Sequence, residues 1–210
     1  MEGWFDFEHP HIISYITDKA LMAYEKALGS QNEVNQKAIH KQLKWGREYV
    51  FTHGRSLIPR GIYTFSTTPH FTPKELKDNR ILCELVFLLT QRDNQEEELL
   101  PILRNSFMDG ARQYIRSQML PSLYKLKAGV GLNYVSPYFG PGLFSIPIKE
   151  IHEYYSFLKV KPDLAILKGH MLDPLSSFIG GIYGLEENTI ISPCANCHSH
   201  ANCQFCLIDK

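Results

Sequence analysis

The feature that most constrains the fold of this chain is a cysteine cluster near its end, Cys194-Ala-Asn-Cys197-His-Ser-His-Ala-Asn-Cys203-Gln-Phe-Cys206. Four of the five cysteines lie there, as two C-x2-C pairs separated by five residues. Each pair lets two thiolates turn toward one metal, and two pairs complete a tetrahedral site or hold an iron–sulfur cluster. The spacing therefore predicts a metal or cluster site at Cys194, Cys197, Cys203 and Cys206. The alternative is a pair of disulfides or four unliganded thiols.

The segment around these cysteines has few apolar side chains, so metal–thiolate bonds would have to order it. We therefore expect one domain over residues 1–190 and a metal-binding or cluster-binding tail over 191–210. The fifth cysteine, Cys83, begins the apolar run Cys83-Glu-Leu-Val-Phe-Leu-Leu-Thr90. That run is typical of a buried strand, so Cys83 is predicted to be a core residue and not a ligand.

Charge and hydropathy narrow the class of protein. Lysine plus arginine equals aspartate plus glutamate, at 22 each, and this balance argues against a general nucleic-acid binder. No apolar run approaches the ~20 residues that a membrane helix needs. The start, Met-Glu-Gly-Trp-Phe-Asp-Phe-Glu, is acidic and aromatic, unlike a signal peptide. We expect a cytoplasmic protein, where thiols stay reduced and clustered cysteines bind metal.

Periodicity and turn residues predict an α+β fold: a twisted, mostly antiparallel sheet with packed helices, followed by the cysteine tail. Gly29 and Gly54 are expected to end the first two helices, and Leu120-Pro121 to interrupt the third. Helices are predicted over 17–28, 33–51, 94–127 and 147–158, and strands over 61–66, 83–90, 130–135, 163–167 and 178–183. A helix start is expected at 72–76 and a turn at 171–174.

The loop Ser136-Pro-Tyr-Phe-Gly-Pro-Gly142 is dense in turn formers and aromatic residues. The strand that follows 171–177 contains Gly180 and Gly181, and glycines in a strand suggest close approach by a ligand or by another backbone. Both interpretations stay open. The candidate cofactor-binding residues are Ser136, Tyr138, Gly140 and Gly180.

The order of these segments resembles the activation (reactivation) domain of vitamin B12-dependent methionine synthase, and especially its free-standing homologues. The series runs from Ser136-Pro-Tyr-Phe-Gly140 through the helix 147–158 and the strand 163–168. It continues with Met171-Leu-Asp-Pro-Leu-Ser-Ser177 into Gly180. Free-standing members of that family often end in a cysteine cluster, as this chain does. The similarity covers about the last third of the chain, and residues 83–110 fit more loosely.

Two departures from the family bear on S-adenosylmethionine. In the family, an arginine two residues before the serine and a glutamate at the end of a strand help bind this cofactor. The corresponding residues here are Tyr134 and Lys168. Replacing a carboxylate by an ammonium removes an acceptor and places a like charge beside a sulfonium. We therefore expect weak or absent S-adenosylmethionine binding.

The resemblance implies an accessory component of a cobalamin-dependent methyltransferase system. Such a protein would dock on a corrinoid protein and assist its reductive activation or methyl transfer. The protein would contact cobalamin only through that partner. A [4Fe–4S] cluster in the tail would be a possible electron donor to the cobalt. The docking surface is expected at 136–142, with Tyr138 and Phe139 as anchors or as plugs of their own core, and at 171–177. The alternative is a non-catalytic binding protein whose tail holds structural zinc.

Overall fold

The structure, a computed structural model, describes residues 1–31, 36–91 and 100–188. Its central element is the strand β3 (Ile81–Thr90), whose apolar run is buried on both faces. Successive side chains of a strand point to opposite faces, so a strand between two layers is mostly apolar on both faces. Cys83, Leu85, Phe87 and Leu89 face one hydrophobic core, and Val86 and Leu88 face another. The predicted buried strand and the core position of Cys83 are confirmed.

The main sheet has the order β1-β2-β3-β7-β4, and every pairing in it is antiparallel. The long neighbours of β3 are β2 (Arg60–Ser66) and β7 (Phe178–Leu185). The edges are the short strands β1 (Glu2–Trp4) and β4 (Tyr134–Val135). The predicted mixture of helices with a mostly antiparallel sheet is confirmed, whereas the cysteine tail lies outside the described residues.

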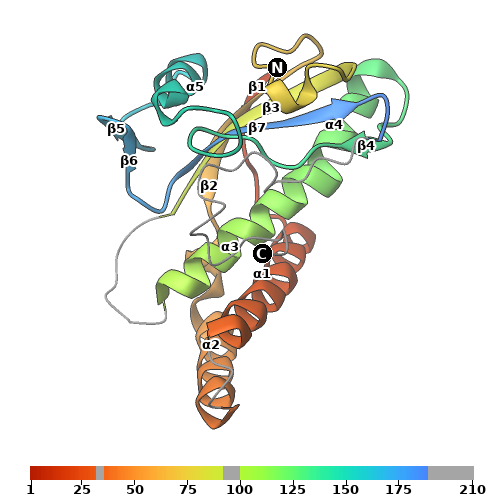
Figure 1. The fold of residues 1–210 in the computed structure, drawn as a ribbon. Coiled ribbons are helices and arrows are strands. Elements are labelled where there is room, and N and C mark those ends of the chain that lie inside the picture. The colour runs from red at the N-terminus through yellow and green to blue at the C-terminus, as the bar shows by residue number, and fades with distance from the viewer. Residues whose placement is uncertain (32–35, 92–99, 189–210) are drawn as a thin grey trace.

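One face of the sheet is covered by helices α1 (Pro10–Gln31) and α3 (Leu100–Tyr114), while α2 (Gln36–Leu57) packs against α1 (Figure 1). A Cβ at Gly110 in α3 would collide with the backbone oxygen of Ile16, so glycine permits this close helix crossing. The stripe of α1 that faces the core repeats every four residues, as helical geometry requires: Ile16, Ala20, Tyr24 and Leu28.

The predicted interruption at Leu120-Pro121 takes a different form. A π-helical turn, η2 (Ile115–Met119), joins α3 directly to α4 (Leu120–Ala128). Pro121 falls in the first turn of α4, where its missing N–H removes no helical hydrogen bond. The helix ends at Gly129, which has a φ of 74° in the left-handed region.

The second core lies on the opposite face of the sheet. It is covered by the short helix η3 (Ile148–Glu150), α5 (Ile151–Phe157) and a separate hairpin of β5 (Ile166–Lys168) and β6 (Met171–Asp173). Figure 1 shows α5 and this hairpin together, apart from α1 to α3. The helix predicted over 147–158 is confirmed in this form.

Several predicted boundaries were wrong. Gly29 and Gly54 lie inside α1 and α2, because a helical glycine costs only about 1 kcal/mol and packing compensates for it. The strand expected over 130–135 pairs only at β4, and the one over 163–167 begins at Ile166. The turn expected at 171–174 is strand β6, and 72–76 forms only the 3-10 turn η1 (Lys74–Leu76). Across the described ranges, no helix has the length and apolar character to span a membrane.

Candidate functional site

The four tail cysteines, Cys194, Cys197, Cys203 and Cys206, lie outside the described residues, and their site stays a prediction. In the described part of the chain, no three His, Cys, Asp or Glu side chains come together as a metal site. Cys83 is fully buried, and burial raises the pKa of its thiol to about 12. A hydrogen bond from the Gly184 backbone opposes this shift and the charge of Glu84 adds to it. At neutral pH the thiol is protonated, which is the poorly ligating form.

The loop 136–142 continues the edge of the sheet beyond β4. The backbone N–H of Ser136 donates to the Tyr183 carbonyl at 2.8 Å, and the Tyr183 N–H donates to the Ser136 hydroxyl at 3.0 Å. Farther along, Phe139 and Gly181 exchange two backbone hydrogen bonds, of 2.9 and 2.7 Å. The loop is thereby fixed to β7 along its length.

Of the candidate residues, Tyr138, Gly140 and Gly180 come together, whereas Ser136 pairs with Tyr183 farther along β7. A Cβ at Gly140 or Gly180 would collide with the Tyr138 ring and with backbone oxygens. The close approach that these glycines allow is therefore made by Tyr138 and by the neighbouring backbone. Of the two explanations that the sequence left open, the structure shows backbone and side-chain packing at this point.

Tyr138 is partly buried and is held by several neighbouring groups. Its hydroxyl donates to the Ile179 carbonyl, and its ring centroid lies 4.0 Å from that of Phe178. The guanidinium of Arg112 lies 4.1 Å from the Phe178 ring centroid and 5.8 Å from that of Tyr138, within cation–π range. Burial raises the pKa of Tyr138, an effect that the Arg112 charge partly offsets. Phe139 is completely buried in the second core. Both aromatics thus serve as packing residues of their own fold.

By contrast, the segment 171–177, called the 171–177 turn below although it begins with strand β6, exposes large apolar side chains to solvent. Met171 is 62% exposed and Leu175 is 76% exposed, so two large apolar side chains face solvent within five residues. Between them the Asp173–Pro174 peptide bond is cis. Lys168 donates to the Asp173 carboxylate across the β5–β6 hairpin. Tyr134 is exposed on edge strand β4.

Two histidines that are far apart in sequence meet on the surface. The rings of His152 on α5 and His170 between β5 and β6 lie 5.2 Å apart, edge to face, and both side chains are exposed. The sequence gave no reason to pair them, because they lie in different elements and no single helix or strand spans the eighteen positions between them.

A buried carboxylate orders the segment before β3. Glu84 has no exposed surface, and it accepts hydrogen bonds from the backbone N–H groups of His70 and Phe71, at 2.8 and 3.2 Å. The His70 ring nitrogen Nδ1 lies 2.7 Å from the same carboxylate. These contacts satisfy a charge that would be costly if unpaired.

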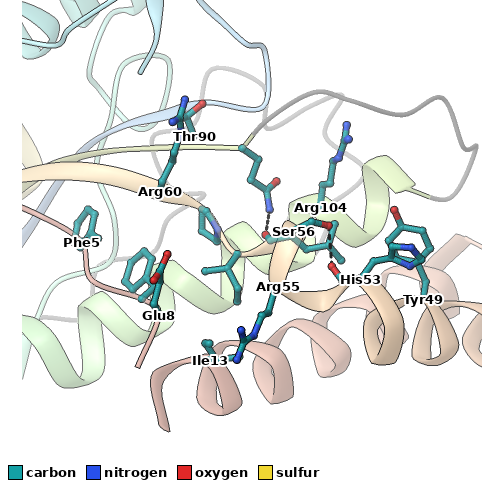
Figure 2. A pocket seen from close by; sticks show the side chains of 15 residues that line it. Phe5, Glu8, Ile13, Tyr49, His53, Arg55, Ser56, Arg60, Thr90 and Arg104 are labelled. Carbon is teal, nitrogen blue, oxygen red and sulfur yellow. Dashed lines mark hydrogen bonds between the residues drawn. The ribbon is translucent and has the colours of Figure 1, made fainter. Parts of the chain in front are cut away.

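A cavity lined by several distant segments was missed by sequence reasoning. It is a cavity of about 680 Å³ between the end of α2, the segment before α1, and the adjoining ends of β2, β3 and α3. Figure 2 shows Arg55, Arg60 and Arg104 on different sides of it, with His53 beside Tyr49 at one end. A signal was present in His53-Gly-Arg-Ser-Leu-Ile-Pro-Arg60, a basic stretch at a helix end.

No protein-family model matches the sequence, and no curated protein matches it significantly.

Proposed function

We propose that this protein is an accessory component of a cobalamin-dependent methyltransferase system. It docks on a corrinoid protein and assists reductive activation or methyl transfer. Its tail holds an iron–sulfur cluster through Cys194, Cys197, Cys203 and Cys206. A cluster bound by thiolates supplies one electron at low potential, which zinc cannot do because its oxidation state does not change.

The observation that carries the proposal is the ordered series of segments from Ser136 to Gly180, followed by the cysteine pairs. The arrangement in space supports it. Residues 136–140 and the glycine-containing strand β7 are direct neighbours, joined through Phe139 and Gly181. The intervening turn 171–177 projects apolar side chains into solvent.

The docking surface is narrower than the sequence suggested. Tyr138 and Phe139 are engaged in their own packing, so they are not available as anchors without unfolding the loop. Met171 and Leu175 take that role, with Ile166 at 44% exposure on the paired strand β5. Exposed apolar side chains gathered in one place are typical of protein-binding surfaces.

Purification without oxygen tests the tail. Brown protein with broad absorption near about 400 nm indicates an iron–sulfur cluster. Colourless protein with one zinc per chain supports the alternative, a non-catalytic binding protein with a structural zinc site. Cys197→Ser should lower the metal content, and Cys83→Ser should not. Equal loss in both variants would contradict the assignment of the ligands.

A pull-down with a cobalamin-loaded protein from the same cell tests the partner. The double variant Met171→Ala with Leu175→Ala should lose binding and keep its melting temperature. The matched control is Met22→Ala with Leu126→Ala, the same residue types at 62% and 77% exposure on α1 and α4. Equal loss in both double variants contradicts the docking surface. No binding by the unmodified protein in any cobalt oxidation state contradicts the corrinoid function.

A further inference from the structure

The cavity between α2 and the ends of β2 and β3 combines three features that the packing of the fold does not require. It has an apolar floor, positively charged groups around its opening, and a buried polar atom without a hydrogen-bond partner. Its volume, about 680 Å³, lies in the range of small-molecule sites in proteins.

The floor is built from aromatic and aliphatic side chains. Phe5 and Phe7 stack with ring centroids 4.9 Å apart, and both are buried. Leu57, Ile58 and Pro59 continue the apolar lining along the end of α2. A surface of this kind accommodates a ring or another compact apolar body.

The rim is cationic. Arg55, Arg60 and Arg104 line the cavity, and Glu8 is the only carboxylate among its described lining residues. Arg55 and Arg60 are exposed at the opening. Arg60 uses one N–H to donate to the Asp163 carbonyl at 2.9 Å, which fixes its guanidinium while other donors stay accessible.

One polar side chain of the lining, that of Gln91, is almost completely buried. Gln91 is 3% exposed, and its amide nitrogen donates to the Leu57 carbonyl. Its amide oxygen, Oε1, is buried and meets no donor among the described residues. Unpaired buried acceptors cost about 1–3 kcal/mol, so a native protein keeps one only where something compensates for it. Because this oxygen has almost no accessible surface, a ligand hydroxyl or N–H group in the cavity would satisfy it once the Gln91 side chain turns toward the ligand.

We propose that this cavity binds a small organic anion, a carboxylate or phosphate ester with an apolar ring and a hydroxyl or N–H donor. The ring lies on Phe5 and Phe7, the anionic group faces one of the rim arginines, Arg55 or Arg60, and the donor bonds to Gln91 Oε1. The proposal does not rest on the proposed function, although the cavity adjoins the 171–177 turn: Ser176 and Ser177 donate to Gln91 and Thr90, at 3.2 and 2.8 Å.

The probe is 8-anilinonaphthalene-1-sulfonate, which carries a sulfonate, an N–H group and aromatic rings and becomes fluorescent when bound. N-phenyl-1-naphthylamine is its neutral counterpart. Titration of the full-length protein should give one site per chain, with the anion bound about tenfold tighter than the neutral probe, a difference of about 1.4 kcal/mol. Equal affinities for the two probes would overturn the proposal.

Variants locate the binding. Arg55→Gln with Arg60→Gln should weaken the anionic probe at least about tenfold and leave the neutral probe unchanged. The control is Arg47→Gln with Arg80→Gln, two exposed arginines paired with glutamates outside the cavity. Unchanged affinity in the first pair, or equal loss in both pairs, would overturn the site.

Two further measurements complete the test. Gln91→Leu should weaken the anionic probe while circular dichroism stays that of the unmodified protein, and if this variant does not fold, the arginine pair alone decides. Competition with phenyl phosphate and with benzoate then distinguishes the phosphate ester from the carboxylate. Displacement by either supports the proposal, and displacement by neither overturns it.

Discussion

Phe139 offers the sharpest test of how the loop 136–142 is built. Its side chain is completely buried, with ring centroids 4.5 Å from Phe144 and 5.8 Å from Tyr183. Phe139→Ala removes roughly 100 Å² of buried apolar surface, or about 2.5 kcal/mol at 25 cal/mol per Å². The cavity that remains and the lost ring contacts bring the total to about 4 kcal/mol.

For a protein of this size, such a loss lowers the melting temperature by about 8–16 °C. The assay is urea unfolding followed by circular dichroism, with a thermal melt beside it. The matched control is Phe51→Ala on α2, because the Phe51 side chain is 92% exposed. That substitution should change the free energy of unfolding by no more than about 0.5 kcal/mol. A Phe139→Ala variant within about 1 kcal/mol of the unmodified protein would refute the packing role and return Phe139 to the surface.

Four other outcomes are expected. Glu84→Ala should lower the free energy of unfolding in urea by about 3 kcal/mol, because the backbone N–H groups of His70 and Phe71 lose a charged acceptor. Glu84→Gln should cost less, and a loss under about 1 kcal/mol for the alanine variant would contradict this role. Gly180→Ala should lower the free energy of unfolding by about 1–3 kcal/mol, because the new methyl group would collide with the backbone oxygen of Phe139. Gly29→Ala, inside α1, meets no atom within 4 Å and should be neutral or stabilising. The reverse order of stability would be inconsistent with the structure. Burial raises the pKa of Cys83 to about 12, so as the pH rises the unfolded chain loses this proton before the folded protein does. The free energy of unfolding should therefore fall between about pH 9 and 12, by up to about 1.4 kcal/mol per pH unit from this thiol. Cys83→Ala should remove that contribution from the slope of unfolding free energy against pH, and an unchanged slope would contradict it. Calorimetry should show no micromolar binding of S-adenosylmethionine, since each lost charge-assisted contact costs about ten- to a hundredfold in affinity, and a micromolar dissociation constant would restore the family's contacts.

Local patterns in the sequence determined the principal elements. The run from Cys83 to Thr90 specifies a buried strand because no surface position suits eight residues in succession of which six are apolar. The stripe through Ala20, Tyr24 and Leu28 specifies a helix because its spacing matches 3.6 residues per turn. Helix ends were poorly predicted, since Gly29 and Gly54 are weak local signals that tertiary packing overrides.

The candidate functional residues also fall into two groups: those that a local sequence pattern predicts and those whose role depends on contacts between distant segments. The spacing of Cys194, Cys197, Cys203 and Cys206 is a local signal, so the sequence states the expected ligands without a fold. Whether the aromatics of the 136–142 loop face a partner or their own core depends on what lies across from them, and that is a long-range property. The structure decides it by placing β7 against the loop, which buries Phe139 and leaves the 171–177 turn exposed.

The sequence shows a basic stretch at the end of α2, but only the tertiary structure shows that it lines a cavity. Arg55 and Arg60 are near one another in the sequence, but Arg104, Gln91 and Phe5 come from three other segments. Each of these residues has an ordinary local explanation as a helix, strand or turn residue. Only the packing of the ends of α2, β2, β3 and α3 around one space gives them a common role, because contacts between distant segments leave no periodicity in the sequence.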